Sequence, residues 1–354
     1  MPPTTTTAGQ PPPLPPMREV RVNLSHGSGG RAMRTLIEHV WVPAFGNSSA
    51  EDQARLPLDE LTRLGDRLAF TTDTYVVNPL FFPGGDIGAL AVAGTVNDLA
   101  VGGARPLWLS CGMVLEEGLP TETLHRVAES MRRMADRAGT AIVTGDTKVV
   151  ERGAADKLFI NTAGIGVIPS GIALSARHAR PGDAVIVSGA IGEHGVAILI
   201  ARNQLSLAAD VASDCQPLDG LVHAMLAAGP DTRCLRDATR GGVATVLNEF
   251  AHASGVGIRI RERNLPIPEP VRGACEILGL DPLYLANEGK LVAVVAPHDA
   301  EPVLAAMRGH PAGVDAAVIG EVTRGPKGMV VLETVFGSER IVDMLVGDQL
   351  PRIC

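Results

Sequence analysis

Glycine and aromatic content constrain the fold of this chain more strongly than any other feature of its sequence. The chain has 40 glycines among 354 residues, whereas Phe, Trp and Tyr together make up only 3% of it. A core with so few rings must be built from Ala, Val, Leu and Ile, with backbones that approach closely at glycine. This composition favours an α/β enzyme with glycine-rich loops over a recognition module lined by aromatic side chains.

Length and charge narrow the class of protein further. At ~150 residues per domain, the chain is long enough for about two domains. Its 39 acidic residues outnumber its 31 basic residues, for a net charge of −8, which argues against general nucleic-acid binding. No apolar run approaches the ~18 residues of a spanning helix, so we expect no membrane association. The N-terminal residues also lack the apolar segment of a signal peptide, and we therefore expect a cytoplasmic protein.

Hydrophobic periodicity divides the chain into two α/β units, which lie between a Pro-rich arm and a C-terminal tail. We place the disordered arm at residues 1–19, the first unit at 20–168, the second at 169–337 and the mobile tail at 338–354. In the first unit the pattern predicts strands at 20–24, 67–77, 141–143 and 158–167, and helices at 86–101 and 121–138. In the second unit it predicts strands at 184–187, 291–295 and 317–319, and a helix at 241–253.

Three acidic motifs of the first unit indicate a metal site. Asp73 and Asp146 each follow an apolar strand, where a carboxylate would face a shared crevice, and Asp98 follows Asn97 within a predicted helix. Separated carboxylates of this kind hold Mg²⁺ ions, which in turn bridge nucleotide phosphates. Any one of these residues alone would suit a turn or a helix cap. The three together favour the metal site.

Paired glycines open two of the predicted helices, at Gly84–Gly85 and at Gly241–Gly242. Backbone amides at a helix N-terminus attract phosphate, and glycine lets the phosphate approach closely. Arg240 would add a charge-assisted hydrogen bond to such an anion. A plain turn is the alternative at each position. The glycine-rich run from His26 reads as a flexible anion-binding loop, and the P-loop motif is absent from the sequence.

Three further residues combine a reactive side chain with an ambiguous setting. Glu288 interrupts apolar sequence just before a strand. It belongs to a solvated turn, or it acts as a general base. His194 is similarly ambiguous, since a single His is more often structural. The five cysteines include no C-x-x-C pair, which argues against a zinc ribbon or a disulfide framework. Cys354 is the last residue of the sequence, where a thiol on a flexible tail could enter and leave an active site, although an accidental terminal Cys remains the alternative.

Seven motifs make the chain resemble the HypE family of hydrogenase maturation proteins, within the superfamily of aminoimidazole ribonucleotide synthetase and selenophosphate synthetase. The resemblance covers residues 20–354. The motifs are HGSGG from His26, TTDTYVVNPLFFPGGDIG from Thr71, GTVNDLAVGGARP from Gly94, TGDTKVV from Thr144, LRDATRGG from Leu235, LANEGK from Leu285 and the terminal PRIC.

This resemblance implies an α/β (α+β) fold of two domains, like that of aminoimidazole ribonucleotide synthetase, with a flexible C-terminal tail. The first half would form a homodimer through strands of a shared barrel, with ATP in a cleft near that interface. The implied reaction is the ATP-dependent dehydration of an S-carboxamide on the terminal cysteine to a thiocyanate. The carbamoyltransferase HypF would supply the carboxamide, and a HypC–HypD complex would accept the cyanide on iron.

The resemblance also implies roles for individual residues. Cys354 would carry the carboxamide, Glu288 would act as the base, Lys148 would steady developing charge, and His194 is a weaker candidate for the base. Mg²⁺ would be held by Asp73, Asp98 and Asp146, and ATP by Asn97, Thr147, Gly84, Gly85, Arg240, Gly241 and Gly242. Two other functions stay open: phosphorylation of a diffusible small molecule, for which the tail would be dispensable, and an ATP-sensing scaffold for maturation partners without turnover.

Overall fold

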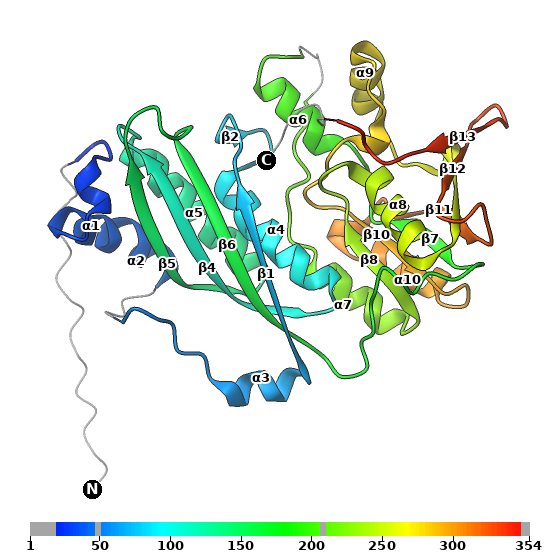
Figure 1. Cartoon of the computed structure of the whole chain (residues 1–354), viewed down its shortest axis with the longest axis horizontal. Coiled ribbons are helices and arrows are strands. Elements are labelled where there is room, and N and C mark those ends of the chain that lie inside the picture. The colour runs from blue at the N-terminus through cyan, green and yellow to red at the C-terminus, as the bar shows by residue number, and fades with distance from the viewer. Residues whose placement is uncertain (1–18, 47–50, 206–209, 348–354) are drawn as a thin grey trace, which may run out of the picture.

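Each half of the chain is built on its own β-sheet (Figure 1). The computed structural model describes residues 19–46, 51–205 and 210–347. The predicted N-terminal arm therefore lies almost entirely outside the described residues, as does Cys354. Among the residues described, no helix is both long and apolar enough to cross a membrane.

The first half contains a four-stranded sheet in the order β1-β6-β4-β5. Its strands are β1 (Arg67–Tyr75), β4 (Arg105–Glu116), β5 (Ala141–Val150) and β6 (Leu158–Ile168). β4 and β5 run parallel, and the other neighbours are antiparallel. α4 (Ile87–Val101) and α5 (Thr121–Arg137) lie behind this sheet in Figure 1. A short hairpin of β2 (Phe81–Phe82) and β3 (Gly85–Asp86) leads into α4.

The two helices behind the sheet differ in how they are buried. α4 is apolar around almost its whole circumference because it packs between the sheet and the second half, and the Asp86 carboxylate caps its first turn by accepting from Gly88 and Ala89. α5 is amphipathic and buries one face, which includes Leu124, Val127 and Met131. The helices predicted at 86–101 and 121–138 are thus confirmed.

The other face of the first sheet carries apolar side chains that the described residues leave uncovered. Phe70, Ile165 and Trp108 lie in register across β1, β6 and β4, and Phe70 is 72% exposed. Leu68 on the same strand is 63% exposed. We call this surface the open face of the sheet. Apolar strands exposed to this degree on a folded protein mark an interaction surface.

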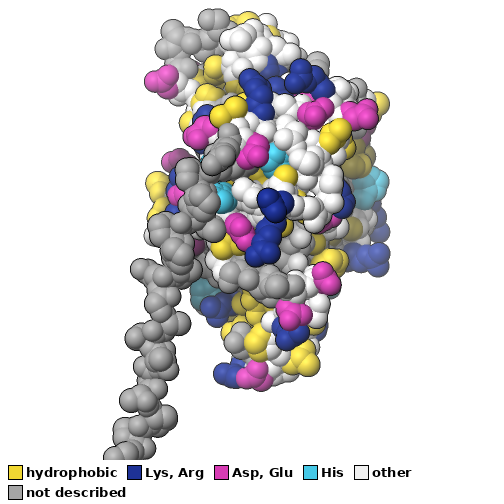
Figure 2. All heavy atoms as spheres, turned by 90° about the vertical axis from the view of Figure 1, so that its left-hand side faces the viewer, with side chains coloured by type: hydrophobic (Ala, Val, Ile, Leu, Met, Phe, Trp, Pro, Cys, Tyr) yellow, Lys and Arg dark blue, Asp and Glu magenta, His cyan; other side chains and the backbone are white. Residues whose placement is uncertain are grey.

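A helical stretch before the sheet packs against the edge strand β5 and against α5. It consists of η1 (Leu24–Gly27), α1 (Arg31–Leu36), the π-helical η2 (Ile37–Trp41) and α2 (Val42–Phe45), and α3 (Leu58–Leu64) follows it. The strand predicted at 20–24 is wrong: Arg21 makes a single bridge to Pro120, and the Asn23 side chain caps η1, which ends the extended backbone. On the side of the molecule that faces the viewer in Figure 2, basic and acidic side chains are interspersed.

The second half contains a seven-stranded sheet in the order β13-β12-β9-β11-β7-β10-β8. Its core is divided between the two faces of this sheet: α8 packs on one face, and α7 and α10 pack on the other. The strands are β7 (Ala184–Val187), β8 (Thr232–Asp237), β9 (Gly257–Arg261), β10 (Leu291–Val295), β11 (Ala317–Thr323), β12 (Val330–Glu333) and β13 (Glu339–Val342). The helices are α6 (Glu193–Ala201), α7 (Asp219–Ala228), α8 (Gly242–Ser254), α9 (Glu269–Leu278) and α10 (Ala300–Arg308), with the short turns η3 (Glu262–Asn264), η4 (Pro282–Tyr284) and η5 (Pro311–Gly313).

Two segments differ from the sequence-based expectation. The strand predicted at 141–143 continues to Val150, so Asp146 lies inside a strand and not at its end. Residues 339–342 of the expected tail form β13, because Val342 is buried in the core and the strand pairs with β12. Residues 348–354 of that tail lie outside the described part of the chain.

The apolar face of α5 should contribute most of the stability that holds this helix on the first sheet. Leu124→Ala removes a side chain that is 0% exposed and should lower the free energy of unfolding by about 2–5 kcal/mol. Leu58→Ala is the matched control, because Leu58 is 75% exposed and its loss should change stability by less than about 0.5 kcal/mol. Urea unfolding followed by circular dichroism checks both values, and equal midpoints for the two variants would contradict the assignment.

Candidate active site

Acidic side chains from both halves meet around one cavity of about 400 Å³, which we call the acid cavity. Asp73 comes from β1, Asp98 from α4 and Asp237 from the end of β8. Glu288, from the turn before β10, also lines it. The remaining lining residues are Thr72, Tyr75, Gly94, Arg236, Thr239, Arg240, Thr245, Val246 and Glu249.

Hydrogen bonds and ion pairs orient the carboxylates at the mouth of the acid cavity. Nη2 of Arg240 lies 3.0 Å from Oδ1 of Asp73, which joins the second half to the first across the cavity. The Thr71 hydroxyl donates to Oδ2 of Asp98 at 2.9 Å. Arg236 pairs with Glu249 on α8 at 3.0 Å. Two arginines therefore stand among the five carboxyl groups that line the cavity.

Burial raises the pKa of three of these carboxyl groups. The pKa of Asp237 rises to about 7, chiefly through burial and then through the nearby Asp98. Burial also raises the pKa of Asp98, against the opposing effect of its hydrogen bond from Thr71. The pKa of Glu288 lies well above its ordinary value because of burial, followed by repulsion from Asp214 and Asp237. A divalent cation would relieve this repulsion, and Asp73, Asp98 and Asp237 offer the oxygen donors that Mg²⁺ prefers, but their ligand oxygens do not all lie within 4.8 Å of one another in the described part of the chain.

Glycine at the start of α8 is required by the packing beside the acid cavity. A Cβ on Gly242, where φ is +60°, would lie 2.5 Å from the carbonyl oxygens of Leu283 and Leu285. The helix therefore begins in direct contact with the loop that leads to Glu288. Gly241 precedes it at φ +73°, next to Thr245 of the cavity wall. The Gly241–Gly242 pair and Arg240 thus stand at the cavity, where the sequence analysis expected a nucleotide.

Asp146 lies on the opposite face and at the opposite edge of the first sheet from Asp73. Asp73 pairs with Thr162, which faces α4, whereas Asp146 pairs with Gly112 in the row that belongs to the open face. Three strand spacings, about 14 Å, separate the two edge strands. Lys148 accompanies Asp146, with Nζ 3.7 Å from Oδ2. Within one protomer the predicted metal site is therefore divided, and Asp146 and Lys148 stand apart from the acid cavity.

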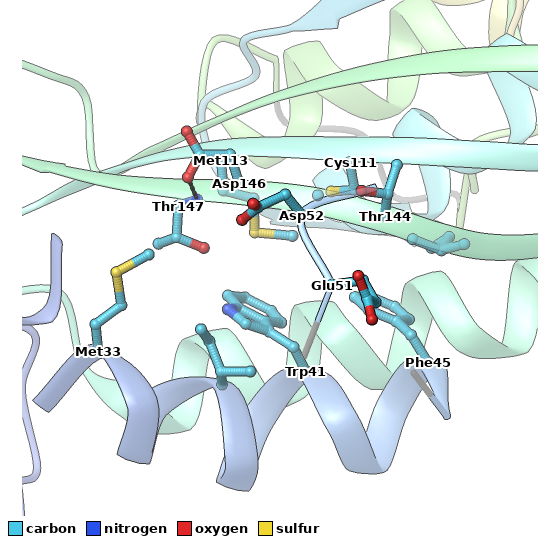
Figure 3. Close-up of a pocket in the computed structure, with 13 residues that line it drawn as sticks. Met33, Trp41, Phe45, Glu51, Asp52, Cys111, Met113, Thr144, Asp146 and Thr147 are labelled. Carbon is cyan, nitrogen blue, oxygen red and sulfur yellow. Dashed lines mark hydrogen bonds between the residues drawn. The ribbon is translucent and has the colours of Figure 1, made fainter. Parts of the chain in front are cut away.

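Beneath Asp146 a second cavity of about 440 Å³ opens between the helical stretch and β5, and we call it the Trp41 cavity (Figure 3). Trp41 and Phe45 form one wall, with their rings stacked at 6.1 Å and only 2° from parallel. In Figure 3, Thr147 points toward Trp41 while the Asp146 carboxylate points away from it. The other walls come from Met33, Ile37, Glu51, Asp52, Cys111, Met113, Ile142, Thr144 and Gly145. The flat, partly apolar shape suits a planar ring system.

Four other predicted site residues lie beside the acid cavity and not in its wall. Gly84 and Gly85 pack against residues 212–215, and the helix that they precede has its first amides capped by Asp86. The amide of Asn97 is occupied by backbone groups of Gln216, Leu218 and Glu288. His194 is fully buried, and burial lowers its pKa to about 4. A bound phosphate cannot use the amides that Asp86 already holds.

Asp237 is a candidate functional residue that the sequence analysis missed. It stands in the motif LRDATRGG, two residues before Thr239, in a segment for which a plain turn before a helix was the alternative. Its position became meaningful only when β10 paired with β8, because this pairing places Leu291 opposite Asp237 and brings the Glu288 turn to the same end of the sheet. An acidic residue at the end of a strand, followed by a glycine pair, was the available signal.

Comparison with known proteins places both halves in one family. Residues 51–168 match the N-terminal domain, and residues 180–333 the C-terminal domain, of AIR synthase related proteins. The carbamoyl dehydratase HypE of Rhodobacter capsulatus is 55% identical over 96% of this chain and 99% of its own length. The carbamoyl dehydratase HypE of Escherichia coli K12 is 54% identical over 94% of this chain and 99% of its own length.

Solved structures agree with this comparison. A crystal structure of the hydrogenase maturation protein HypE in complex with ATP superposes with a TM-score of 0.88, at 50% identity, and covers 94% of this chain and 99% of that one. A HypE chain from a HypE–HypF complex superposes with a TM-score of 0.77, at 48% identity, and covers 88% of this chain and 99% of its own. The two-domain α/β fold expected from the sequence is confirmed.

The acid cavity should make the metal-free protein less stable as the pH rises. The folded pKa of Asp237, about 7, lies above the ordinary value of 3.8, so the folded state binds a proton that the unfolded state releases between these values. Wild-type protein should therefore lose stability from about pH 4 to about pH 7, and Asp237→Asn should not lose this part. Melting temperatures across this range should show a widening gap in favour of the variant.

Added Mg²⁺ supplies the control for this measurement. It should raise the melting temperature of the wild type and have a much smaller effect on Asp237→Asn, because a ligand that binds only the folded state stabilises it by mass action. A gap between the two proteins that stays constant with pH would contradict the raised pKa, and equal responses to Mg²⁺ would remove Asp237 from the metal site.

Proposed function

The chain belongs to the HypE family of AIR synthase related proteins, and from this membership we propose that it uses ATP to dehydrate an S-carboxamide on its own Cys354 to a thiocyanate. The observation that carries the proposal is the acid cavity, where Glu288 lines the same space as the carboxyl groups of Asp73, Asp98 and Asp237. A phosphoryl-transfer site and a base for deprotonation are thereby side by side.

Removal of water from an amide needs a better leaving group than its oxygen. Transfer of the γ-phosphoryl group of ATP to the carboxamide oxygen provides one, and loss of both NH₂ protons then expels phosphate and forms S–C≡N. The products are the thiocyanate, ADP and phosphate, so the atoms of the lost water leave with the phosphate and the protons. Phosphoryl transfer depends mainly on positioning and charge neutralisation. The residues around the acid cavity suit both requirements.

Asp73, Asp98 and Asp237 would hold Mg²⁺, which when bound neutralises charge on the polyphosphate. Arg240 would contact a phosphate oxygen from the start of α8, because a guanidinium donates charge-assisted hydrogen bonds to phosphate. Glu288 would accept protons from the carboxamide nitrogen, since its buried setting gives the carboxylate a high proton affinity. The pKa of His194 makes it a poor alternative base, and its ring lies outside the cavity wall.

The Trp41 cavity would receive the adenine ring, with Thr147 at its wall. Asp146 lines this cavity, Lys148 pairs with it, and β5, which carries both, lies about 14 Å across the sheet from the strand of Asp73. We therefore propose that the active site is shared within a homodimer formed through the open face. Asp146 and Lys148 of one protomer would complete the acid cavity of the other, and Lys148 would steady the charge that develops on the substrate.

The carboxamide would reach Cys354 from a HypF carbamoyltransferase, and the cyanide would leave for iron on a HypC–HypD complex. The solved HypE–HypF complex of a relative supports the first of these partners. The terminal sequence Pro351–Cys354 is short, and Arg352 is its single charged side chain. Such a segment suits entry into a cavity. The cyanide would become a ligand of the iron in [NiFe]-hydrogenase.

Mass spectrometry of the C-terminal peptide tests the reaction itself. The protein is incubated with the carbamoylating partner, its substrates and Mg-ATP, with a non-hydrolysable ATP analogue in the control. Cys354 should gain a carboxamide in both samples and lose one water only with hydrolysable ATP. Glu288→Gln should accumulate the carboxamide and form at least about a hundredfold less thiocyanate. Unmodified Cys354 beside an active partner would overturn the proposal in favour of a small-molecule kinase.

Mixing two inactive variants tests whether the site is shared. Asp146→Asn and Glu288→Gln should each be inactive alone, because each breaks both sites of its own dimer. In heterodimers one site would carry both substitutions and the other none, so a statistical mixture should recover about a quarter of the wild-type activity. Mixing the two variants in the unfolded state and refolding them together ensures exchange of protomers, and size-exclusion chromatography checks the dimer. A mixture as inactive as its components would place the whole site within one protomer.

A further inference from the structure

The turn that carries Glu288 is held by a buried carboxylate from a distant part of the chain. The backbone N–H of Glu288 donates to Oδ1 of Asp214 at 2.9 Å, and that of Gly289 donates to Oδ2 at 3.3 Å. Asp214 lies in the segment between α6 and α7, and its side chain is only 1% exposed. A buried carboxylate that accepts two backbone donors forms strong, directional contacts. The position of the turn therefore depends on Asp214.

Lys290 offsets the charge of this buried carboxylate. Its Nζ lies 3.4 Å from Oδ2 of Asp214 and 3.7 Å from Oε2 of Glu193, and its side chain is only 8% exposed. Burying a carboxylate without a partner would be strongly unfavourable, and the lysine reduces this penalty. Lys290 belongs to the same turn as Glu288, so the ion pair adds a further link between the turn and Asp214.

The remaining contacts leave the turn little freedom to move. A Cβ on Gly289 would lie 1.9 Å from the carbonyl oxygen of Asp214, so the two backbones are in direct contact. The Gln216 side chain donates to the carbonyl of Gly289 at 3.2 Å, and Asn97 on α4 donates to the carbonyl of Glu288 at 3.4 Å. Residues of both halves thus donate hydrogen bonds to the backbone of the turn that carries the Glu288 side chain.

We propose that Asp214, with its charge offset by Lys290, is the positioning residue that holds the Glu288 turn so that the Glu288 carboxylate meets the carboxamide in the acid cavity. This inference rests on the proposed role of Glu288 as the base. Asp214 is absent from the described residues that line the cavity, and it acts through the backbone amides of residues 288 and 289. Displacement of a reacting group by about 1 Å can lower a rate by about a hundredfold.

Asp214→Asn is the decisive variant, because it keeps the size of the side chain while removing its charge. The new amide donor would also face one of the two N–H groups. We expect the single-turnover rate of thiocyanate formation on carbamoylated Cys354 to fall at least about tenfold, with the KM for ATP changed less than about twofold. A general loss of structure would instead change both values together.

Asp183→Asn is the matched control. Asp183 is also a buried carboxylate that accepts a backbone N–H, from Arg180 at 2.7 Å, and pairs with a basic side chain, Arg233, at 2.9 Å. It precedes β7 at the end of the sheet opposite to Glu288, because Ala184 pairs with Val295 and Glu288 lies before Leu291. We expect Asp183→Asn to lower the melting temperature and to leave the rate of the remaining folded protein within about twofold.

Amide hydrogen exchange separates this inference from the proposed reaction, because it reads the turn directly. Asp214→Asn should speed exchange in a peptide that spans residues 285–291, and Asp183→Asn should not. Wild-type protein that forms no thiocyanate would overturn the proposed function, while the exchange data would still decide whether Asp214 holds the turn. Unchanged exchange, or a full dehydration rate in Asp214→Asn, would overturn the positioning role.

Discussion

Carboxyl groups that repel one another meet around one cavity, and both halves of the protein supply them. The structure must hold these groups together against their repulsion. Glu288 is buried there, Asp98 and Asp237 are half-buried, and the loss of solvent raises the pKa of each. Such a group of acids is unfavourable unless rigid elements hold its members together and a cation or a proton relieves their charge. Here α4, the end of β8 and the turn before β10 each supply one acid from a well-packed backbone. In the proposed function, these acids would receive a metal-bound polyphosphate.

The joint between the halves is part of the site and does not merely connect two domains. α4 packs on one face of the first sheet, and the last residues of the helix, Ala100 and Val101, pack in the core of the second half. Asn97 on the same helix bridges backbone groups around residues 216–218 and 288. The segment before α7 also belongs to this joint, because the Asp214 carboxylate accepts hydrogen bonds from the backbone of the Glu288 turn. A shift of one half against the other would therefore move the proposed base, Glu288, relative to the proposed metal ligands.

The topology of the first sheet explains why the predicted site residues form two separate groups within one chain. Sheet order puts β1 and β5 at opposite edges, and the alternation of side chains puts Asp73 and Asp146 on opposite faces. Among the described residues, helices cover only the other face of this sheet. The apolar row of Phe70, Ile165 and Trp108 therefore needs a partner surface. The proposed homodimer would satisfy both requirements with one interface.

Local patterns in the sequence determined the regular elements and the chemical character of the site. Periodic apolar residues predicted α4, α5 and β10, because each has a single buried face or is buried throughout, and the motifs around Asp73, Arg240 and Glu288 marked residues that do line one cavity. Only the tertiary structure decided which acids meet. Strand order is set by contacts between residues far apart in the chain, and this order brought Asp237 to the cavity and carried Asp146 to the far edge of the sheet. The hold of Asp214 on the Glu288 turn has the same origin, because 74 residues separate the two partners and only the packed halves bring them together.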